Sequence, residues 1–482
     1  MGAMATSELE ELEFLKSWEP LPGQPPLRIF EQLVNFEFLD SDQQQARLTN
    51  KIQNTLKYAT REISYYRNLF EKLSLKAADF RSLADLGRIP VLTRFDIVNF
   101  FEYLRAQKLG VYQKDFFTTK TSGSTGLPVK TLLTRHNKSM FAIYGQRQAR
   151  WFRLDISQRF ARIRIPPDLF RTPDGQLNPD GNTTSSPVWM NAGFFYKTGD
   201  EVNFNVSNPR QAQLDWLEKY QPTYLLTYPG LLEELALANN CQSLPYLKAL
   251  LPVSSMLTTA MRARIDQSFG IPIYQNYGLN EVGIVAVQCN AGRYHVHTEQ
   301  ALVEIVDAEG QAVSAGESGR LLVTTLSNSA MPLIRYDTGD IATATEGPCL
   351  CGRTLPSFKN ILGRHIRFAG TPEQTRPLLN GLLSVITDMP NEYFTNIHQY
   401  QIYQSKQENF EFRVVTVGDM HEAFESTLQA TWRMLNSDDG ARKLSFVHVD
   451  EIEATPSGKQ LDFVSAFHTL ESDFKTDNSH RT

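Results

Sequence analysis

The sequence predicts an α/β protein in which a large N-terminal body of α/β layers with a β-rich subdomain is followed by a small α+β domain. Three observations carry this prediction. The chain has 482 residues, too many for one hydrophobic core, so two or three domains are expected. In its middle, short β-rich runs alternate with helical stretches, which is the pattern of an α/β layer fold. After residue 364 a new alternation of strands and one helix begins.

The first part of the chain is predicted to be helical, because apolar residues recur with helical spacing from about 27 to 110. A further helix is predicted to start near Thr93, shortly after Pro90. β-rich runs follow at 223–228 and 249–253. The expected elements of the β-rich subdomain are strands at 283–288, 301–306 and 320–326, with turns at Gly310 and 316–319.

We place the boundary between the two predicted domains after Arg364. The body then spans 8–364 and the C-terminal domain 365–482, whereas residues 1–7 resemble a cloning remnant. In the C-terminal domain we expect strands at 399–404, 410–417 and 446–449, and a helix at about 420–435.

Composition excludes several classes of function. The formal net charge of -5, from 48 basic and 53 acidic residues, offers no general attraction for nucleic acid or an anionic membrane. The four cysteines do not form the framework of a secreted disulfide protein, and no apolar stretch is long enough to cross a bilayer. We therefore expect a cytoplasmic protein that binds any phosphate locally.

The first candidate site is a loop rich in glycine, serine and threonine that follows a β-like run at 115–119. Small residues let backbone N–H groups and hydroxyls approach phosphate oxygens closely. The loop is not of the Walker type, because Lys130 does not follow a glycine at the required spacing. A flexible surface turn is the alternative. The candidate phosphate-binding residues are Thr121, Ser122, Gly123, Ser124, Thr125, Gly126 and Lys130.

Four later segments accompany this loop: Tyr-Gly-Leu-Asn-Glu at 277–281, Ile-Arg-Tyr-Asp-Thr-Gly-Asp at 334–340, Leu-Gly-Arg at 362–364 and Thr-Pro-Ser-Gly-Lys at 455–459. In this order, loop and segments resemble the motifs of the adenylate-forming superfamily of acyl-CoA synthetases, peptide-synthetase adenylation domains and luciferases. The later motifs narrow the resemblance to the phenylacetate-CoA ligase-like branch. It covers about 80–470 and implies a nucleotide-binding body with a small mobile C-terminal lid.

The resemblance implies a role for each matching residue. Tyr277 would stack on adenine, and Glu281 would help to hold Mg²⁺. Asp340 would accept hydrogen bonds from the ribose hydroxyls. Lys459, on the lid, would reach the substrate carboxylate and the α-phosphate. The implied catalytic residues are Lys459, Glu281 and Thr125, and Asn276, Tyr277, Gly278, Asp340 and Arg364 join the loop in binding the nucleotide.

Three departures from the family pattern stand in these segments. Asn280 occupies a position usually held by serine or threonine, and Asp337 one usually held by arginine. After Arg364 the run 365–370 (His-Ile-Arg-Phe-Ala-Gly) replaces the acidic hinge residues of the branch. Because family members rotate the lid between two half-reactions, the altered hinge bears on the second of them.

The implied activity is ATP-dependent conversion of a carboxylic acid to its acyl-adenylate with release of pyrophosphate, followed by transfer to coenzyme A. Transfer to a carrier protein or to an amine or hydroxyl acceptor is the alternative. A non-catalytic nucleotide-binding protein is a third possibility, and retention of both Glu281 and Lys459 argues against it. The implied cofactors are ATP, Mg²⁺ and coenzyme A, in a monomer or homodimer.

A Cys/His set in the β-rich stretch predicts a metal site. Cys289, His295, Cys349 and Cys351 can supply three thiolates and one imidazole to a tetrahedral structural zinc ion. Four protein ligands leave no open position, which argues against a catalytic metal. Ordinary buried thiols with a surface histidine are the alternative. Several phenylacetate-CoA ligase-like proteins carry such a cluster.

Aromatic residues around the expected acid site favour an aromatic carboxylate of the benzoate, hydroxybenzoate or anthranilate type, although such residues are more often core. Six arginines between 147 and 164 could meet the phosphates of coenzyme A, and a solvated helix face is the alternative. The candidate substrate residues are Tyr144, Trp189, Phe194, Tyr228 and Gly278.

Overall fold

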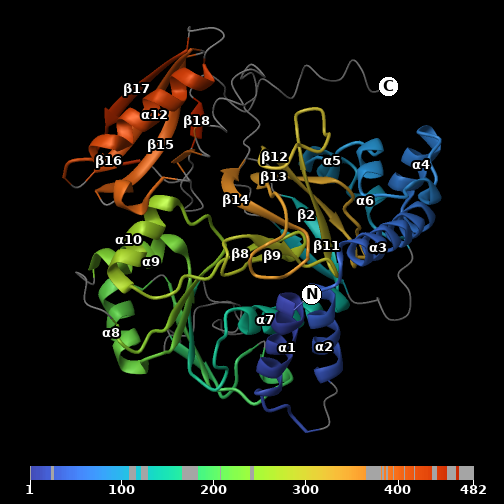
Figure 1. Cartoon of the computed structure of the whole chain (residues 1–482), viewed down its shortest axis with the longest axis horizontal. Helices are drawn as coiled ribbons and strands as arrows, with labels where there is room; N and C mark the ends of the chain where they lie inside the picture. Colours follow the sequence, from blue (N-terminus) through green and yellow to red (C-terminus); the bar gives the residue numbers. More distant parts are fainter. Residues whose placement is uncertain are drawn as a thin grey trace, which may run out of the picture.

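The structure is a computed structural model of the whole chain. It describes residues 2–22, 26–107, 116–120, 129–164, 183–190, 192–206, 208–238, 244–364, 382, 385–386, 389–394, 396–406, 408–416, 418–436, 442–452 and 463–465. Figure 1 shows three regions: blue helices beside a central β-rich region, a green α/β region, and an orange-red C-terminal α+β region.

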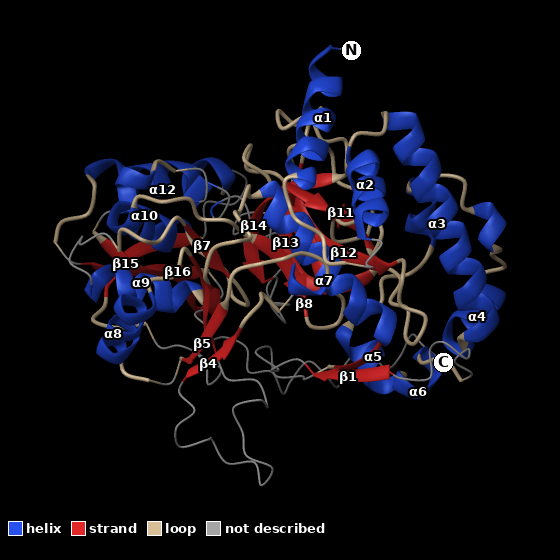
Figure 2. Ribbon diagram, turned by 90° about the horizontal axis from the view of Figure 1, so that it is seen from below, coloured by secondary structure: helices blue, strands red, loops and turns tan. Residues whose placement is uncertain are grey.

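The N-terminal region is helical, as the apolar spacing predicts. Asp40 begins the long third helix with a capping box, in which its side chain accepts from the backbone of Gln43 and the Gln43 side chain accepts from the Asp40 N–H. Figure 2 shows this helix and the next along one side of the molecule. The elements are α1 (Gly2–Lys16), α2 (Pro26–Glu37), α3 (Ser41–Glu62), α4 (Ser64–Lys72), η1 (Ala77–Asp79), η2 (Ala84–Arg88), α5 (Arg94–Asn99) and α6 (Phe101–Leu104).

Two of these helices bear on sequence expectations. The helix predicted near Thr93 is α5, and Thr93 and Asp96 form its capping box. The chain is already helical from Gly2, inside the segment 1–7 that resembles a cloning remnant, and Glu11 and Leu15 of α1 are buried. The origin of residues 1–7 remains a prediction.

A five-stranded sheet forms the α/β region, in the order β4-β5-β3-β6-β7. β5, β3, β6 and β7 are parallel and β4 is antiparallel to β5. Because crossover connections between parallel strands commonly run through helices, α8 lies between β5 and β6 in the chain, and α9 lies between β6 and β7. The elements are β3 (Phe160–Arg164), β4 (Thr183–Ser186), η5 (Ala192–Phe194), β5 (Glu201–Asn205), α8 (Arg210–Tyr220), β6 (Tyr224–Thr227), α9 (Pro229–Ala238), β7 (Ala249–Pro252) and α10 (Thr259–Phe269).

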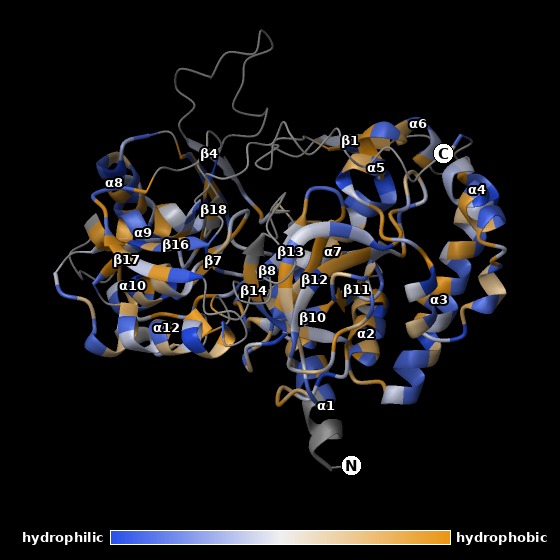
Figure 3. Ribbon diagram, turned by 90° about the horizontal axis from the view of Figure 1, so that it is seen from above, coloured by the Kyte–Doolittle hydropathy of each residue, from blue (hydrophilic) through white to orange (hydrophobic). Residues whose placement is uncertain are grey.

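The central region is an antiparallel seven-stranded sheet in the order β11-β12-β13-β14-β10-β9-β8. The hydropathy colouring of Figure 3 shows strongly apolar segments in this sheet. A hairpin of two further strands leads directly into α7. The elements are β1 (Phe116–Lys120), β2 (Lys130–Thr134), α7 (Arg135–Trp151), β8 (Asn276–Leu279), β9 (Gly283–Gln288), β10 (Tyr294–Val296), β11 (Ala301–Val306), β12 (Ser318–Thr325), β13 (Tyr336–Ala344) and β14 (Ser357–Arg364).

The C-terminal strands form their own four-stranded sheet, in the order β17-β16-β15-β18. Its apolar core includes Ala260 and Ala263 of α10, so this sheet packs against the α/β region. The elements are η6 (Asn391–Phe394), β15 (Ile397–Lys406), β16 (Asn409–Thr416), α12 (Glu422–Leu435), β17 (Lys443–His448) and β18 (Phe463–Ser465).

The fold class predicted from the sequence is confirmed. The expected strands at 283–288 and 301–306 are β9 and β11, and the helix expected at about 420–435 is α12. The division of the chain into domains at Arg364 remains a prediction. In the part of the chain that the structure describes, we find no helix both long and apolar enough to span a membrane.

Candidate active site and metal-binding cluster

Part of the predicted active site lies outside the described residues. The loop residues 121–126, which include Thr125, are in this group, as are Lys459 and the hinge run 365–370. The strands that flank the loop are described: Lys120 at the end of β1 stands opposite Lys130 at the start of β2. The Lys130 ammonium lies 4.8 Å from the centre of the Phe101 ring.

Two of the predicted nucleotide-binding residues meet directly. The Tyr277 hydroxyl, from β8, donates a hydrogen bond of 2.6 Å to Oδ2 of Asp340, from β13. Burial, and then the negative charge of Asp340, raise the pKa of Tyr277 well above its ordinary value, so the phenol stays a neutral donor. The side chains predicted to bind adenine and ribose therefore lie next to each other.

This contact shows that the central sheet is curled. β13 and β8 are separated in it by β14, β10 and β9, which in a flat sheet would place them about 19 Å apart at the usual strand spacing. A 2.6 Å hydrogen bond between their side chains requires β8 to turn back towards β13. The Phe358 ring, on β14, packs edge-on against the Tyr277 ring with 5.9 Å between their centres. The curl brings motifs 63 residues apart to one site.

Glu281 lies in the turn between β8 and β9 and is 4% exposed. Its Oε1 accepts a 2.9 Å hydrogen bond from the Tyr336 hydroxyl, and an Arg94 guanidinium nitrogen lies 3.7 Å from the same oxygen. Within the described residues, Oε2 of Glu281 has no hydrogen bond or ion pair. A carboxylate with remaining acceptor positions suits a hard cation such as Mg²⁺.

The other predicted nucleotide-binding residues lie nearby. Antiparallel pairing sets Arg364 of β14 opposite Asp340 of β13. The Asn276 amide donates to Gln148 of α7 at 3.3 Å. A Cβ on Gly278 would lie 3.1 Å from the Gly283 carbonyl oxygen, so the close β8–β9 turn favours glycine there.

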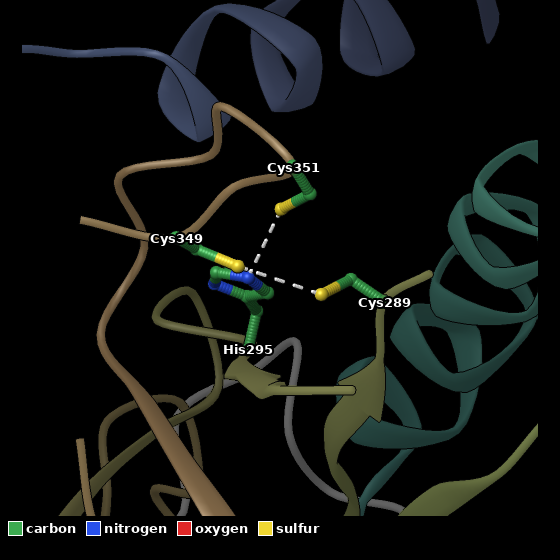
Figure 4. Close-up of side chains that lie close together, drawn as sticks. All are labelled: Cys289, His295, Cys349 and Cys351. Carbon is green, nitrogen blue, oxygen red and sulfur yellow. Dashed lines mark hydrogen bonds between the residues drawn. The ribbon is translucent and has the colours of Figure 1, made fainter. Parts of the chain in front are cut away.

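The four residues predicted to hold zinc converge (Figure 4). Their ligand atoms all lie within 4.8 Å of one another. Cys289 follows β9, His295 lies on β10, and Cys349 and Cys351 lie on the segment between β13 and β14. The Cys289 and Cys349 sulfurs are 3.6 Å apart, and the Cys351 sulfur is 3.3 Å from Nε2 of His295.

These separations fit a tetrahedral ion and not a disulfide. With Zn–S bonds of about 2.3 Å, two sulfur ligands on a tetrahedron lie about 3.8 Å apart, whereas a disulfide bond is about 2.0 Å long. His295 Nδ1 lies 3.0 Å from the Leu355 carbonyl oxygen, a contact that lets this nitrogen donate and leaves Nε2 to bind a metal. The donor set therefore fits a closed structural zinc site.

Two glycine turns position the cysteines of this cluster, and neighbouring groups change the pKa values of their thiols. Gly292 and Gly352, both with φ of +80°, close short turns by donating to the carbonyls of Cys289 and Cys349. Hydrogen bonding from Cys289, and from His295, outweighs burial and lowers the pKa of Cys351. The same hydrogen bond, and then burial, raise the pKa of Cys289, so Cys351 is the thiol that its surroundings favour as the metal-binding thiolate.

The sequence of this chain is similar to those of known proteins. A family model described as AMP-binding enzyme matches residues 189–330. The phenylacetate-coenzyme A ligase of Thermus thermophilus is 25% identical over 349 residues, covering 68% of this chain and 72% of the relative. The corresponding ligase of Escherichia coli K12 is 27% identical over 350 residues, covering 69% and 74%.

The family model and these relatives support the adenylate-forming superfamily, in its phenylacetate-CoA ligase-like branch, as the group to which this chain is similar. Its fold agrees with this assignment. The structure of a 2-hydroxyisobutyryl-CoA ligase in the postadenylation state, in complex with 2-HIB-AMP, superimposes with a TM-score of 0.63 at 17% identity, covering 89% of this chain and 91% of that one.

The aromatic residues predicted to line the acid pocket do not share one environment. Tyr144 is fully buried and stacks on His297 at 4.6 Å, and Trp189 packs against Phe160 at 4.9 Å. Phe194 is 64% exposed. Tyr228 follows β6 at the end of that strand. Contact of these four residues with the acid remains a prediction, and Tyr228 is the one at a strand end.

The arginines of α7 lie in an environment that matches neither of the two alternatives considered from the sequence. Arg147 and Arg150 are neither at a phosphate site nor on a solvated helix face, since they are 1% and 2% exposed. Both pair with Glu37 of α2, which also pairs with Arg353 next to the cysteine cluster. Buried guanidinium groups require such partners. The wider charge cluster adds Glu11, Arg153, Glu299 and Arg47.

The site also contains residues that sequence reasoning did not single out. Tyr336 stands inside the quoted segment 334–340, yet nothing in its spacing indicates that it donates to Glu281. Arg94, the first residue of α5, lies near the same carboxylate although it is 187 positions away. Asp337 pairs with Arg320 at 3.0 Å, so its departure from the family pattern serves a local ion pair.

Proposed function

We propose that this protein is an AMP-forming ligase that activates a carboxylic acid with MgATP as the acyl-adenylate and then transfers the acyl group to coenzyme A. One observation carries the proposal: the segment 277–281 meets strand β13 twice, because Tyr277 bonds Asp340 and Glu281 bonds Tyr336. The relatives' activity supports the choice of reaction, since both are phenylacetate-coenzyme A ligases.

In the adenylation step an oxygen of the acid attacks the α-phosphorus of ATP, and the bond from that phosphorus to the bridging oxygen of pyrophosphate breaks. Pyrophosphate leaves with the bonding electron pair. Asp340 is proposed to hold the ribose and Tyr277 to contact adenine. Glu281 would hold Mg²⁺, which neutralises phosphate charge as pyrophosphate departs. The loop 121–126 and Lys130 would bind the phosphates, with Thr125 and Arg364 among the contacts.

Lys459 is proposed to reach this site from the C-terminal domain, 365–482. Its ammonium group would stabilise the negative charge shared by the attacking carboxylate and the α-phosphate. In the second step the thiol sulfur of coenzyme A attacks the acyl carbon, the bond to AMP breaks, and the thiol proton passes to solvent or a base. The departure at 365–370 leaves transfer to a carrier protein as the alternative acceptor reaction.

Two further parts of the proposal concern metal and substrate. Cys289, His295, Cys349 and Cys351 would hold zinc as a structural ion, because four protein ligands fill its coordination shell. The acid is proposed to be aromatic. The aromatic layer between α7 and the parallel sheet, which includes Trp189, supports this class.

Isotope exchange between pyrophosphate and ATP tests the first half-reaction across a panel of aryl and short acyl acids. Mass analysis after adding coenzyme A or a holo-carrier protein identifies the acceptor. We expect exchange with at least one aromatic acid and a thioester with coenzyme A. Absence of exchange with every acid would refute the ligase proposal.

Lys459→Ala tests the proposed lid lysine. We expect adenylation to fall by about 100- to 1,000-fold, because charge stabilisation in the transition state is lost, while ATP affinity is largely retained. Lys443→Ala is the matched control, since Lys443 is an exposed lysine on β17 of the same region. Equal rates for the two variants would contradict the role given to Lys459.

A further inference from the structure

One arginine on the parallel sheet differs from the two arginines that precede it in the chain. Arg159, just before β3, and Arg162 pair with Asp200 and Glu201 at 2.9 and 3.1 Å. Arg164, the last residue of β3, has no carboxylate partner within the described residues. Its Nε, like that of Arg162, is buried without a hydrogen-bond acceptor there.

Arg164 lies at the carboxyl end of β3, the part of an open α/β sheet where ligands bind. β3 pairs with β5 on one side and β6 on the other, and the chain passes from β3 to β5 before crossing to β6. The order of strands therefore reverses between β3 and β6. In open α/β sheets the carboxyl ends at such a reversal form the ligand-binding crevice.

Neighbouring strand ends add to this crevice. The Arg164 guanidinium carbon lies 5.8 Å from the centre of the Tyr228 ring, directly after β6, and Nη2 of Arg164 donates to the Ser254 hydroxyl at 3.2 Å. Ser254 follows β7 and has a backbone φ of +69°, a conformation that is costly for any residue other than glycine. Three strand ends thus surround one guanidinium.

The side chain also lies on the face of the sheet that carries the aromatic layer. Alternate residues of a strand share a face, so Arg164 lies on the same face as Phe160. The Phe160 ring packs against Trp189 at 4.9 Å and near Tyr224 at 6.4 Å. Phe160 begins β3 and Arg164 ends it, so the aromatic layer and the guanidinium lie on one face of the sheet at opposite ends of the strand, about 13 Å apart.

We propose that Arg164 is a specificity residue that binds a second anionic group, a carboxylate or phosphate, on the acid substrate. The inference rests on the proposed function and adds a substrate class to it: acids with two anionic groups. One group reacts with ATP and the other pairs with Arg164. A planar guanidinium offers two parallel N–H donors to such an oxyanion, which a neutral or ammonium side chain cannot do.

Arg164→Gln tests this assignment in the pyrophosphate exchange reaction with paired acids that differ by one carboxylate, such as benzoate with the three benzenedicarboxylates and butyrate with succinate. Wild-type protein should prefer a diacid. The variant should lose about 10- to 100-fold in kcat/KM for that diacid, the scale of a charged hydrogen bond, and change little for the matched monoacid.

Two variants control for folding. Arg164→Lys keeps the charge but loses the paired donors, so an intermediate loss is expected. Arg159→Gln removes an arginine just before the same strand that is already paired, and should leave the diacid preference intact. A wild-type preference for monoacids, or equal losses of Arg164→Gln on both members of a pair, would overturn the inference.

A coenzyme A phosphate is the competing source of the anion, and the second half-reaction separates it. If Arg164→Gln leaves exchange unchanged but abolishes a preference for coenzyme A over dephospho-coenzyme A, the acid assignment is wrong. Failure of the ligase proposal has a different signature, namely no exchange by wild-type protein with any acid. Calorimetric titration with inorganic phosphate then tests the site without catalysis. Binding lost in Arg164→Gln supports the anion site, and equal binding by both proteins overturns it.

Discussion

Glu37 and Glu281 are both buried glutamates, 0% and 4% exposed, but their surroundings differ. Glu37 receives Arg147 and Arg150 on one oxygen and Trp151 and Arg353 on the other. Three of these contacts are hydrogen bonds and the one from Arg147 is an ion pair of 3.0 Å, so both carboxylate oxygens of Glu37 are engaged. Glu281 receives one hydroxyl at 2.9 Å and one guanidinium at 3.7 Å.

The comparison separates two uses of a buried carboxylate. Glu37 is saturated by donors from α7 and from the segment after β13, so it fastens α2 to both and has no capacity for a ligand. Glu281 is positioned by a neutral phenol and keeps acceptor capacity for a cation. Saturation by internal partners therefore indicates a structural group, and incomplete saturation at a strand or turn end indicates a candidate binding group.

The largest effect is expected at the saturated site. Glu37→Gln leaves buried guanidinium groups without their anion and should lower the free energy of unfolding by about 3–5 kcal/mol, measured by denaturant unfolding. Glu19→Gln is the control: Glu19 pairs with Lys197 on the surface, where both side chains are more than half exposed, and about 0–1 kcal/mol is expected. Similar losses of stability in Glu37→Gln and Glu19→Gln would contradict the structural role given to Glu37.

The next largest effect is expected at the cysteine cluster. This cluster is linked to Glu37, because Arg353 follows Cys351 by two residues and pairs with Glu37. Cys351→Ser should abolish tight binding of one zinc ion, measured by metal analysis. Unfolding stability should fall by about 3–4 kcal/mol, the value for free zinc present at several hundred times its dissociation constant.

Cys241→Ser, at the remaining cysteine of the sequence, should retain the metal. The double variant Glu37→Gln, Cys351→Ser should destabilise by less than the sum of the single changes, since both act on the same segment. A folded wild-type protein that contains no zinc would contradict the metal assignment.

The smallest effect is expected at Glu281. Tyr336→Phe removes one hydrogen bond and leaves the carboxylate in place, so we expect a loss of about 0.5–1.5 kcal/mol, or roughly 2- to 13-fold, in kcat/KM for MgATP. The Mg²⁺ concentration needed for half-maximal exchange should rise with it. Tyr58→Phe is a control of the same chemistry, because its hydroxyl donates to the Ser329 carbonyl away from Glu281. No difference between these variants would indicate that Tyr336 does not position Glu281.

The sequence predicted elements better than contacts. Periodic apolar residues and turn glycines located β9, β11 and α12 closely, because these signals act over a few residues. The four cysteine-cluster residues were also found from the sequence, since few residue types bind zinc. The sequence did not predict the burial of Arg147 and Arg150, because helical periodicity says which face is covered and not which charges cover it.

By itself, the sequence determined the α/β fold class, the order of the nucleotide motifs and the identity of the four candidate zinc ligands. Only the tertiary structure decided that Tyr277 meets Asp340 and that Glu37 is saturated while Glu281 is not. It also decided that Arg164 lies where the strand order reverses, without a carboxylate partner among the described residues. The reason is physical: local propensities depend on neighbours in the chain, whereas pairing of buried charges depends on segments that only sheet curvature and helix packing bring together.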